Sequence, residues 1–313
     1  MRVSTGIDEV FRLATPAGRI EWQTLALILG CYAAWLAAGA LYALAPVVGI
    51  VVLALAIALH SSLQHEAIHH HPTRHRGVNE ALMFLPLGLL IPYRRYRELH
   101  LMHHADSRVT DPYDDPESFY LGSRDFERLP RALREVLNWN NMLAVRVVIG
   151  PALSSAGFLL SEVRAGLGAQ GRAVARWRRA WLSHALGLIV LGLIVHLTFA
   201  MPLWAYLAST YLALSLLAVR SFCEHQWADA PDDRTVIVER SLLSGLFLNN
   251  NLHFVHHKHP GLPWYRLPAA YRARRDEWQA MNGGYVFASY GAVMRDFGLR
   301  AKEPVAHPAR PSR

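Results

Sequence analysis

The sequence predicts an all-α integral membrane protein with four transmembrane helices arranged in two hairpins. Hydrophobic residues make up 52% of the 313 residues and gather in long runs, with the charged residues between the runs. This distribution is typical of membrane-spanning chains rather than soluble ones. Seventeen histidines are also present, and most of them lie in three short stretches. The apolar runs predict the membrane helices, and the clustered histidines predict a functional site beside them.

The two hairpins are visible as two pairs of apolar runs. Residues 24–44 and 45–63 form the first pair, and the turn between them carries no charge. Residues 181–200 and 202–219 form the second pair, around an uncharged turn at Met201 and Pro202. Each run has about 20 residues, enough for a helix to cross the ~30 Å hydrocarbon core. Short-turned hairpins leave the remaining segments on one side, and their lysine and arginine content predicts that this side is cytoplasmic.

Two other apolar stretches are not predicted to cross the membrane. Residues 81–92 are too few to span and include Pro86, so we expect a re-entrant or interfacial segment. Residues 143–160 are long enough, but they include Arg146 and Pro151. If they crossed alone, the last histidine stretch would lie on the opposite side from the first two. We therefore expect an interfacial or buried helix there.

These elements predict three parts of the chain. Residues 1–23 form an N-terminal cytoplasmic segment that contains acidic residues and lacks the apolar core of a signal peptide. Residues 24–270 form the membrane domain that carries the histidines. Residues 271–313 form a C-terminal cytoplasmic segment, and the basic, proline-containing tail from Ala301 is expected to be disordered.

Charge and cysteine content exclude several classes of protein. The net charge is +8, but arginines gather beside apolar runs, as at Arg172, Arg176, Arg178 and Arg179 before Trp181. Basic residues in that position indicate a membrane surface rather than nucleic acid. Cys31 and Cys223 are the only cysteines. They are too few for a disulfide framework or for a four-thiolate iron–sulfur or zinc site.

The histidines form three boxes with helical spacing. The boxes read His65-Glu-Ala-Ile-His69, His100-Leu-Met-His103-His104 and His253-Phe-Val-His256-His257. Spacings of three and four place the side chains of each box on one face of a helix. Neutral imidazole is a good ligand for iron, copper and zinc. Eight imidazoles exceed what one tetrahedral zinc needs, so the pattern favours two metal ions over solvated surface histidines.

The three boxes resemble those of the membrane fatty-acid desaturase and hydroxylase superfamily, which includes carotenoid ketolases. The stretches Asn249-Asn-Asn-Leu-His253 and His257-Lys-His-Pro-Gly-Leu-Pro-Trp264-Tyr265 also resemble the third-box context of that superfamily. The likeness covers about residues 45–270. It implies four transmembrane helices under a cytoplasmic helical cap that holds two iron ions, with dioxygen as co-substrate. The ligands it implies are His65, His69, His100, His103, His104, His253, His256 and His257.

Further residues are expected to support these ligands. His225 follows the last apolar run, where related enzymes place another ligand, and we predict that it is a ninth one; a capping or supporting role is the alternative. Ligating histidines usually donate their second ring nitrogen to a carboxylate or carbonyl. Asp106 and Asp111 after the second box are expected to serve in this way, unless they belong only to a hydrated loop. The other expected supporting residues are Glu224, Asn250 and His70.

The resemblance implies oxygen-dependent oxidation of a lipid acyl chain by a membrane-bound, non-haem di-iron oxidoreductase. We expect desaturation, while hydroxylation, ketolation and oxidative decarboxylation to a terminal alkene stay open. Electrons are expected from a separate ferredoxin, rubredoxin or cytochrome with its reductase. In a bacterium, the enzyme would lie in the inner or plasma membrane, with its metal site on the cytoplasmic side.

Two hypotheses from other classes compete with this interpretation. His65-Glu66-Ala-Ile-His69 fits H-E-x-x-H, the signature of zinc metalloproteases in which glutamate is the general base. A protease needs only one more ligand, so this hypothesis leaves the second and third boxes unexplained. The other hypothesis is a histidine-rich metal carrier. The metal content of the purified protein separates both from the di-iron prediction.

Overall fold

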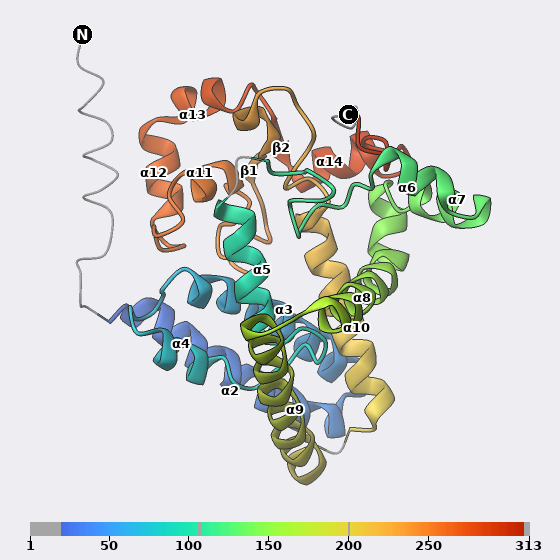
Figure 1. The fold of residues 1–313 in the computed structure, drawn as a ribbon. Coiled ribbons are helices and arrows are strands. Elements are labelled where there is room, and N and C mark those ends of the chain that lie inside the picture. The colour runs from blue at the N-terminus through green and yellow to red at the C-terminus, as the bar shows by residue number, and fades with distance from the viewer. Residues whose placement is uncertain (1–19, 106–107, 200, 310–313) are drawn as a thin grey trace. The chain divides into compact units, whose positions relative to one another are not determined.

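The computed structural model describes residues 20–105, 108–199 and 201–309, which form two compact units (Figure 1). The hairpin unit comprises residues 20–98 and 150–217, and the described part of the histidine unit lies within residues 99–149 and 218–313. Helices α5, α8 and α10 have residues in both units. Of the predicted terminal segments, residues 1–19 and 310–313 lie outside the described part, as does Asp106.

Long helices dominate the hairpin unit. Its elements are α2 (Trp22–Leu44), α3 (Pro46–Ile68), α4 (Arg76–Leu82), the first part of α5 (Tyr93–Ala105), most of α8 (Leu143–Gly168), α9 (Arg172–Thr198) and most of α10 (Leu203–Ser221). The histidine unit contains α6 (Ser123–Arg128), α7 (Arg131–Trp139), η1 (Pro231–Arg234), β1 (Ile237–Arg240), α11 (His253–Lys258), α12 (Leu267–Ala273), α13 (Arg275–Met281), β2 (Val286–Ser289) and α14 (Tyr290–Phe297).

Five of the described helices are long and apolar enough to cross a membrane: α2, α3, α8, α9 and α10. Four of them cover most of each predicted apolar run. Helix α3 continues to Ile68, so the first box lies at its end. The fifth is α8, where the sequence predicted an interfacial or buried helix. By length and hydropathy α8 also qualifies as a span, so the predicted number of four stays a prediction.

The turn between α2 and α3 consists of one residue, Ala45. Pro46 begins α3, a position where proline fits because no backbone N–H is needed there. So tight a turn brings the two backbones together. A Cβ atom added to Gly49 would lie 2.6 Å from the Cα of Tyr42, closer than two carbon atoms can approach. The glycine therefore permits the first hairpin.

The segment between α4 and α5 is a run of turns whose carbonyl groups are bound by side chains from the long helices. Tyr32 donates a hydrogen bond to the carbonyl of Leu82 (2.6 Å), and Tyr206 donates one to the carbonyl of Leu87 (3.0 Å). The His184 ring nitrogen contacts the carbonyl oxygen of Leu89 at 2.9 Å. Non-helical backbone among membrane helices needs such partners, because lipid provides none.

A buried ion pair joins α5 and α8 in the hairpin unit. The Glu162 carboxylate is 2% exposed and accepts hydrogen bonds from the Arg95 guanidinium at 2.8–3.0 Å. The indoles of Trp177 and Trp181 on α9 donate to the same carboxylate at 3.0 and 2.9 Å. A buried carboxylate is tolerated when its charge and its lone pairs are both satisfied. This arrangement fixes α8 and α9 to the start of α5.

The histidine unit contains a small parallel sheet that the all-α prediction omitted. Strands β1 and β2 pair with Ile237 opposite Val286. Each strand has four residues and their pairing partners are distant in sequence. Alternation over so few residues gives no recognisable signal, and a pairing between distant segments is invisible to sequence periodicity.

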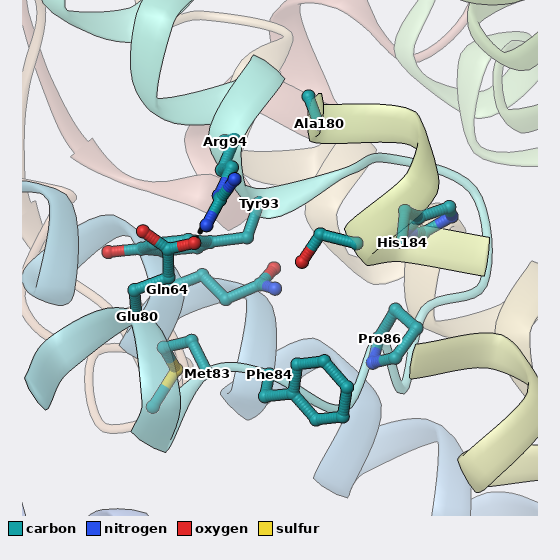
Figure 2. Close-up of a pocket in the computed structure, with 10 residues that line it drawn as sticks. Gln64, Glu80, Met83, Phe84, Pro86, Tyr93, Arg94, Ala180 and His184 are labelled. Atoms are coloured by element: carbon teal, nitrogen blue, oxygen red, sulfur yellow. Dashed lines mark hydrogen bonds and ion pairs between the residues drawn. The ribbon is translucent and has the colours of Figure 1, made fainter. Parts of the chain in front are cut away.

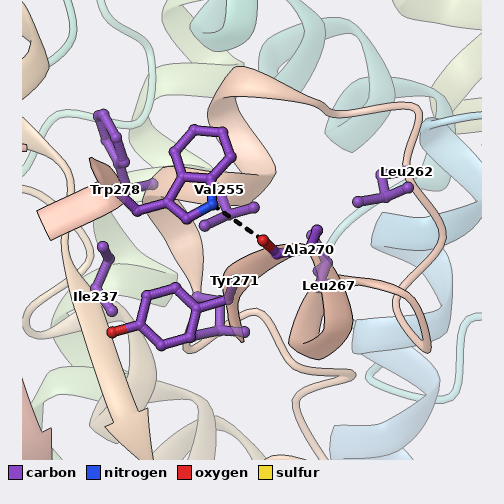
Figure 3. Packing of buried hydrophobic residues seen from close by; sticks show 9 residues of the cluster. Ile237, Val255, Leu262, Leu267, Ala270, Tyr271 and Trp278 are labelled. Atoms are coloured by element: carbon purple, nitrogen blue, oxygen red, sulfur yellow. Dashed lines mark hydrogen bonds between the residues drawn. The ribbon is translucent and has the colours of Figure 1, made fainter. Parts of the chain in front are cut away.

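An apolar cluster packs α11 against β1, α12 and α13 (Figure 3). Phe254 and Val255, between the histidines of the third box, are at most 1% exposed. Trp278 of α13 is 2% exposed, and its indole donates a hydrogen bond to the carbonyl of Ala270 at 3.1 Å. The third box thus lies on a short helix whose apolar side is fixed by this core.

Replacing Trp278 with alanine should destabilise the histidine unit by about 3 to 5 kcal/mol, because it removes a fully buried indole and leaves a cavity. Denaturant unfolding of the purified protein in detergent micelles, followed by circular dichroism, measures the change. The fully exposed Leu242 provides the control: Leu242→Ala should change stability little. Equal stabilities of the two variants would contradict this account of the core.

Candidate metal centre

Four histidines from three segments converge in the histidine unit. They are His103 from α5, His225 from the segment after α10, and His253 and His257 from α11. Their Nε2 atoms lie 3.1 Å (His103–His225), 3.3 Å (His103–His257), 3.1 Å (His225–His253) and 3.2 Å (His253–His257) apart. The second and third boxes and the predicted ninth ligand therefore share one cluster.

The outer ring nitrogens show how this cluster is protonated. His103 Nδ1 lies 2.8 Å from a carboxylate oxygen of Asp115, and His253 Nδ1 lies 2.9 Å from the Asn250 Oδ1 atom. Both oxygens accept hydrogen bonds, so each Nδ1 carries the proton. A neutral imidazole has one N–H, so the Nε2 atoms of His103 and His253 both present lone pairs to the centre of the cluster.

This donor set fits a metal ion. Imidazole nitrogens bind first-row metals at about 2.0–2.1 Å, so neighbouring ligand nitrogens around one ion lie roughly 2.9 to 3.4 Å apart. The four observed separations fall in that range. The Nε2 lone pairs of His103 and His253 are therefore placed to bind a cation together with His225 and His257.

Electrostatics keep most of these imidazoles neutral. Burial, reinforced by the neighbouring imidazoles, holds the pKa of His225, His253 and His257 well below the usual value for histidine. Burial also acts to lower the pKa of His103, but the hydrogen bond to Asp115 together with the negative charges of Asp115, Glu117 and Glu224 raises it above the usual value. Asp115 thus holds the outer proton and places a negative charge beside the cluster, as carboxylates beside metal-bound histidines do.

The other three histidines of these two boxes form a second group. The ring of His104 lies 4.6 Å from that of His100 and 5.0 Å from that of His256, measured between centroids. Burial lowers the pKa of His104 to about 3, so this ring is neutral and able to bind a metal. His104 also stacks on His257 at 4.2 Å. The two groups therefore lie side by side.

The first box belongs to the hairpin unit. His65 lies in the last turn of α3 and His69 caps it, and their rings are 4.9 Å apart. Both side chains are buried, at 3% and 7% exposure. The helical spacing of four therefore brings them together as predicted. His70, which was expected to support a ligand, has a φ of +72° and is exposed at the turn after the helix.

Backbone pairing positions His225. The residues on either side form a short antiparallel ladder: Gln226 donates to the carbonyl of Arg234 (3.0 Å), and Val236 donates to that of Glu224 (3.0 Å). Lys302, whose side chain is 4% exposed, donates a hydrogen bond to the carbonyl of His225 at 2.8 Å. The C-terminal segment thus helps to hold His225 in place, which no sequence motif indicated.

Three consecutive asparagines fix the N-terminus of α11. Asn249 donates to the carbonyl of Trp264 (3.0 Å), and Asn251 donates to that of Val238 (2.7 Å). Asn250 contacts His253, as described above, and donates to the Glu224 carboxylate at 3.2 Å. Asn249 has a φ of +57°, a left-handed conformation that asparagine tolerates better than most residues. The run therefore orients the third box.

Among the described residues, two carboxylates that the sequence did not favour contact box histidines, while the favoured Asp106 lies outside the described part. Asp115 binds His103, and Glu117 lies 2.9 Å from His100 Nδ1. Asp111 instead accepts hydrogen bonds from backbone N–H groups in its own loop, at Tyr113 and Asp114. All these acids come after the second box in one loop, and sequence distance from the histidines does not show which of them the loop turns inward.

The fold and the site together define a protein with several membrane-type helices and histidine clusters that could hold metal ions. The family model for fatty acid desaturases matches residues 41–289. The chain belongs to the fatty acid desaturase family, which confirms the predicted resemblance. It is accordingly a desaturase-like oxidoreductase that acts on lipid and is integrated in the membrane. A comparison with curated proteins finds no match.

Asp115→Asn should weaken metal retention by about 10- to 100-fold, the usual effect of losing the partner of a ligating histidine. Asp115 also accepts backbone hydrogen bonds from Thr110 and Glu117, and an amide replaces one accepting oxygen with a donor. Metal content after timed dialysis against a chelator measures the loss. The control is Asp114→Asn, because the Asp114 carboxylate is exposed and forms an ion pair with Arg108 rather than with a box histidine. Equal retention by both variants would contradict the role of Asp115.

Proposed function

We propose that this chain is a membrane-bound di-iron oxidoreductase that desaturates a lipid acyl chain with dioxygen. The observation that carries the proposal is the cluster of four imidazoles with Nε2 atoms 3.1–3.3 Å apart. A second group of box histidines stacks against it, in a chain of the fatty acid desaturase family. Two adjoining groups of neutral imidazoles are the donor sets that two iron ions require.

The proposed ligands divide between the two ions. His103, His225, His253 and His257 would hold one iron. His100, His104 and His256 would hold the other, and we assign His65 and His69 of the first box to it as well, on the strength of the three-box pattern. When bound, reduced iron supplies dioxygen activation strong enough for an unactivated C–H bond. The chain's own contribution is to keep most of the imidazoles neutral, orient them through Asp115, Glu117 and Asn250, and position the lipid.

An apolar cavity in the hairpin unit supports the proposal that the substrate is a lipid. It has a volume of about 180 Å³ and is lined mostly by apolar side chains, including Ile57, Leu90, Leu214 and Leu217. A cavity of about 150 Å³ holds benzene, so this one accommodates a short segment of acyl chain. Ser61 and Gln64 of α3 also line it. Ser61 lies one helical turn before His65, and Gln64 directly precedes His65. A chain held there would lie beside the helix that carries the first box.

Desaturation is chosen over the other outcomes on family membership. Hydroxylation, ketolation and oxidative decarboxylation use the same kind of ligand set, and they differ only in the step after the first hydrogen removal. The zinc-protease alternative uses His65 and His69 with one further ligand, which leaves the four-histidine cluster without a role. We propose that a separate ferredoxin, rubredoxin or cytochrome supplies the electrons, because basic residues favour encounter with an acidic partner.

The shared cluster also supports a topology. His103 and His257 are 3.3 Å apart at Nε2, and the chain between them passes through α8, α9 and α10. A chain that returns to the same face of a membrane has crossed it an even number of times. We propose that α9 and α10 cross, because an uncharged turn joins them, and that α8 does not. Glu162 and Arg164 near its end agree with an interfacial helix.

Cysteine labelling tests this topology. Gln170, in the exposed turn between α8 and α9, should be accessible from the same side as the exposed Leu242 of the histidine unit. Thr198, at the end of α9, should be accessible from the opposite side. Single-cysteine variants at these positions, in a background lacking Cys31 and Cys223, would be labelled with an impermeant maleimide in right-side-out and inverted vesicles. Labelling of Gln170→Cys together with Thr198→Cys would overturn the assignment of α8.

Metal and product analysis test the proposed activity. The purified protein should contain about two irons per chain, and His103→Ala and His256→Ala should each lose iron, because each removes a ligand of a different ion. In a lipid-producing host, unsaturated products should appear with the native chain and disappear with His103→Ala, as measured by mass spectrometry of fatty acids, hydrocarbons and pigments. His196→Ala is the control, since His196 is exposed on α9. One zinc per chain, or full activity of His256→Ala, would refute the di-iron proposal.

A further inference from the structure

Two neighbouring cavities in the hairpin unit share part of their walls. The apolar cavity of about 180 Å³ and a smaller cavity of about 20 Å³ are both lined by Gln64 and Pro86. The smaller one also reaches α4, the start of α5 and α9. The two cavities therefore adjoin each other at Gln64 and Pro86.

The smaller cavity has more polar groups in its wall than the larger one, although apolar side chains such as Met83 and Phe84 also line it. Gln64, Ser183 and the Glu80–Arg94 ion pair line it, and Figure 2 shows the Gln64 side chain extending between that pair and His184. Within the described residues, the Gln64 amide and the Ser183 hydroxyl make no hydrogen bond to the protein. Two hydrogen-bonding groups that face a confined space gain free energy when an occupant binds them.

Charge and size limit what this occupant can be. Arg94 is already paired with Glu80, so the cavity wall has no net charge, and a carboxylate would meet the Glu80 charge at close range. A neutral oxygen avoids the cost of bringing an uncompensated charge out of water. About 20 Å³ exceeds the roughly 10–15 Å³ that one water needs, so the space fits a small group such as a hydroxyl or an ester carbonyl.

We propose that the smaller cavity binds a neutral oxygen group of the lipid substrate, a hydroxyl or an ester carbonyl, through the Gln64 amide and the Ser183 hydroxyl. The inference rests on the proposed function, because it takes the apolar cavity as the site of the chain. Gln64 directly precedes His65 on α3. Anchoring the oxygen there fixes the chain along the helix that carries the first box, and it makes the substrate a neutral oxygen-bearing lipid rather than a free fatty acid.

Lipid binding to the purified full-length chain in detergent micelles tests the proposal. Hexadecanol, methyl hexadecanoate and ionised hexadecanoate would compete with a fluorescent fatty alcohol. The native chain should bind the alcohol and the ester more tightly than the acid. Gln64→Leu should weaken alcohol and ester binding about two- to tenfold, the value of one hydrogen bond, while Gln23→Leu, at an exposed position on α2, should change nothing.

A second variant reverses the preference. Glu80→Gln removes the partner charge of Arg94, so hexadecanoate should gain affinity relative to hexadecanol. Leu214→Trp, which fills the apolar cavity, should weaken the binding of all three lipids alike.

If the acid binds best to the native chain, or if Gln64→Leu leaves the order of affinities unchanged, the oxygen subsite is refuted while lipid binding stands. If none of the lipids binds, the apolar cavity is not the substrate site, and the lipid assignment in the proposed function fails with it.

Discussion

The histidine unit depends on holding four imidazole rings with their Nε2 atoms close together. His103 and His253 each direct an Nε2 lone pair toward the neighbouring rings of His225 and His257, where a cation can bind. Keeping the rings in this arrangement requires contacts on their outer sides. Asp115 and Asn250 do this through the outer nitrogens, and Lys302 does it through the backbone of His225. Contacts outside the proposed ligand set thus hold the rings in position for a metal ion.

Burial imposes a second constraint on both units, because every polar group removed from water needs a partner. In the hairpin unit, Glu162 satisfies this with one arginine and two indoles. In the histidine unit, the asparagine run satisfies it by bonding carbonyls around α11. The Gln64 amide differs from these groups because it has no protein partner among the described residues. This amide can therefore bind an occupant of the smaller cavity.

Sequence reasoning succeeded where a signal is local. Apolar runs identified the helices that became α2, α3, α9 and α10, because length and hydropathy along one segment decide whether it suits a membrane. Box spacing placed His65 beside His69 and His100 beside His104, because residues four apart share a helical face. His225 was identified by its place after the last apolar run. The sequence did not single out Asp115 among the acidic residues after the second box. The path of the loop, which decides which carboxylate reaches His103, depends on contacts with distant segments.

The amino-acid sequence alone therefore specified the class of this protein: a helical membrane chain of the fatty acid desaturase family with histidine boxes suited to metal binding. Tertiary packing decided which histidines share one cluster, which carboxylates hold their outer protons, and that Lys302 supports His225 across 77 positions of the chain. It also revealed the two cavities that meet at Gln64. The cause is the same throughout. Helix periodicity and hydropathy act within a segment, whereas ligand geometry and cavities arise from contacts between segments far apart in sequence.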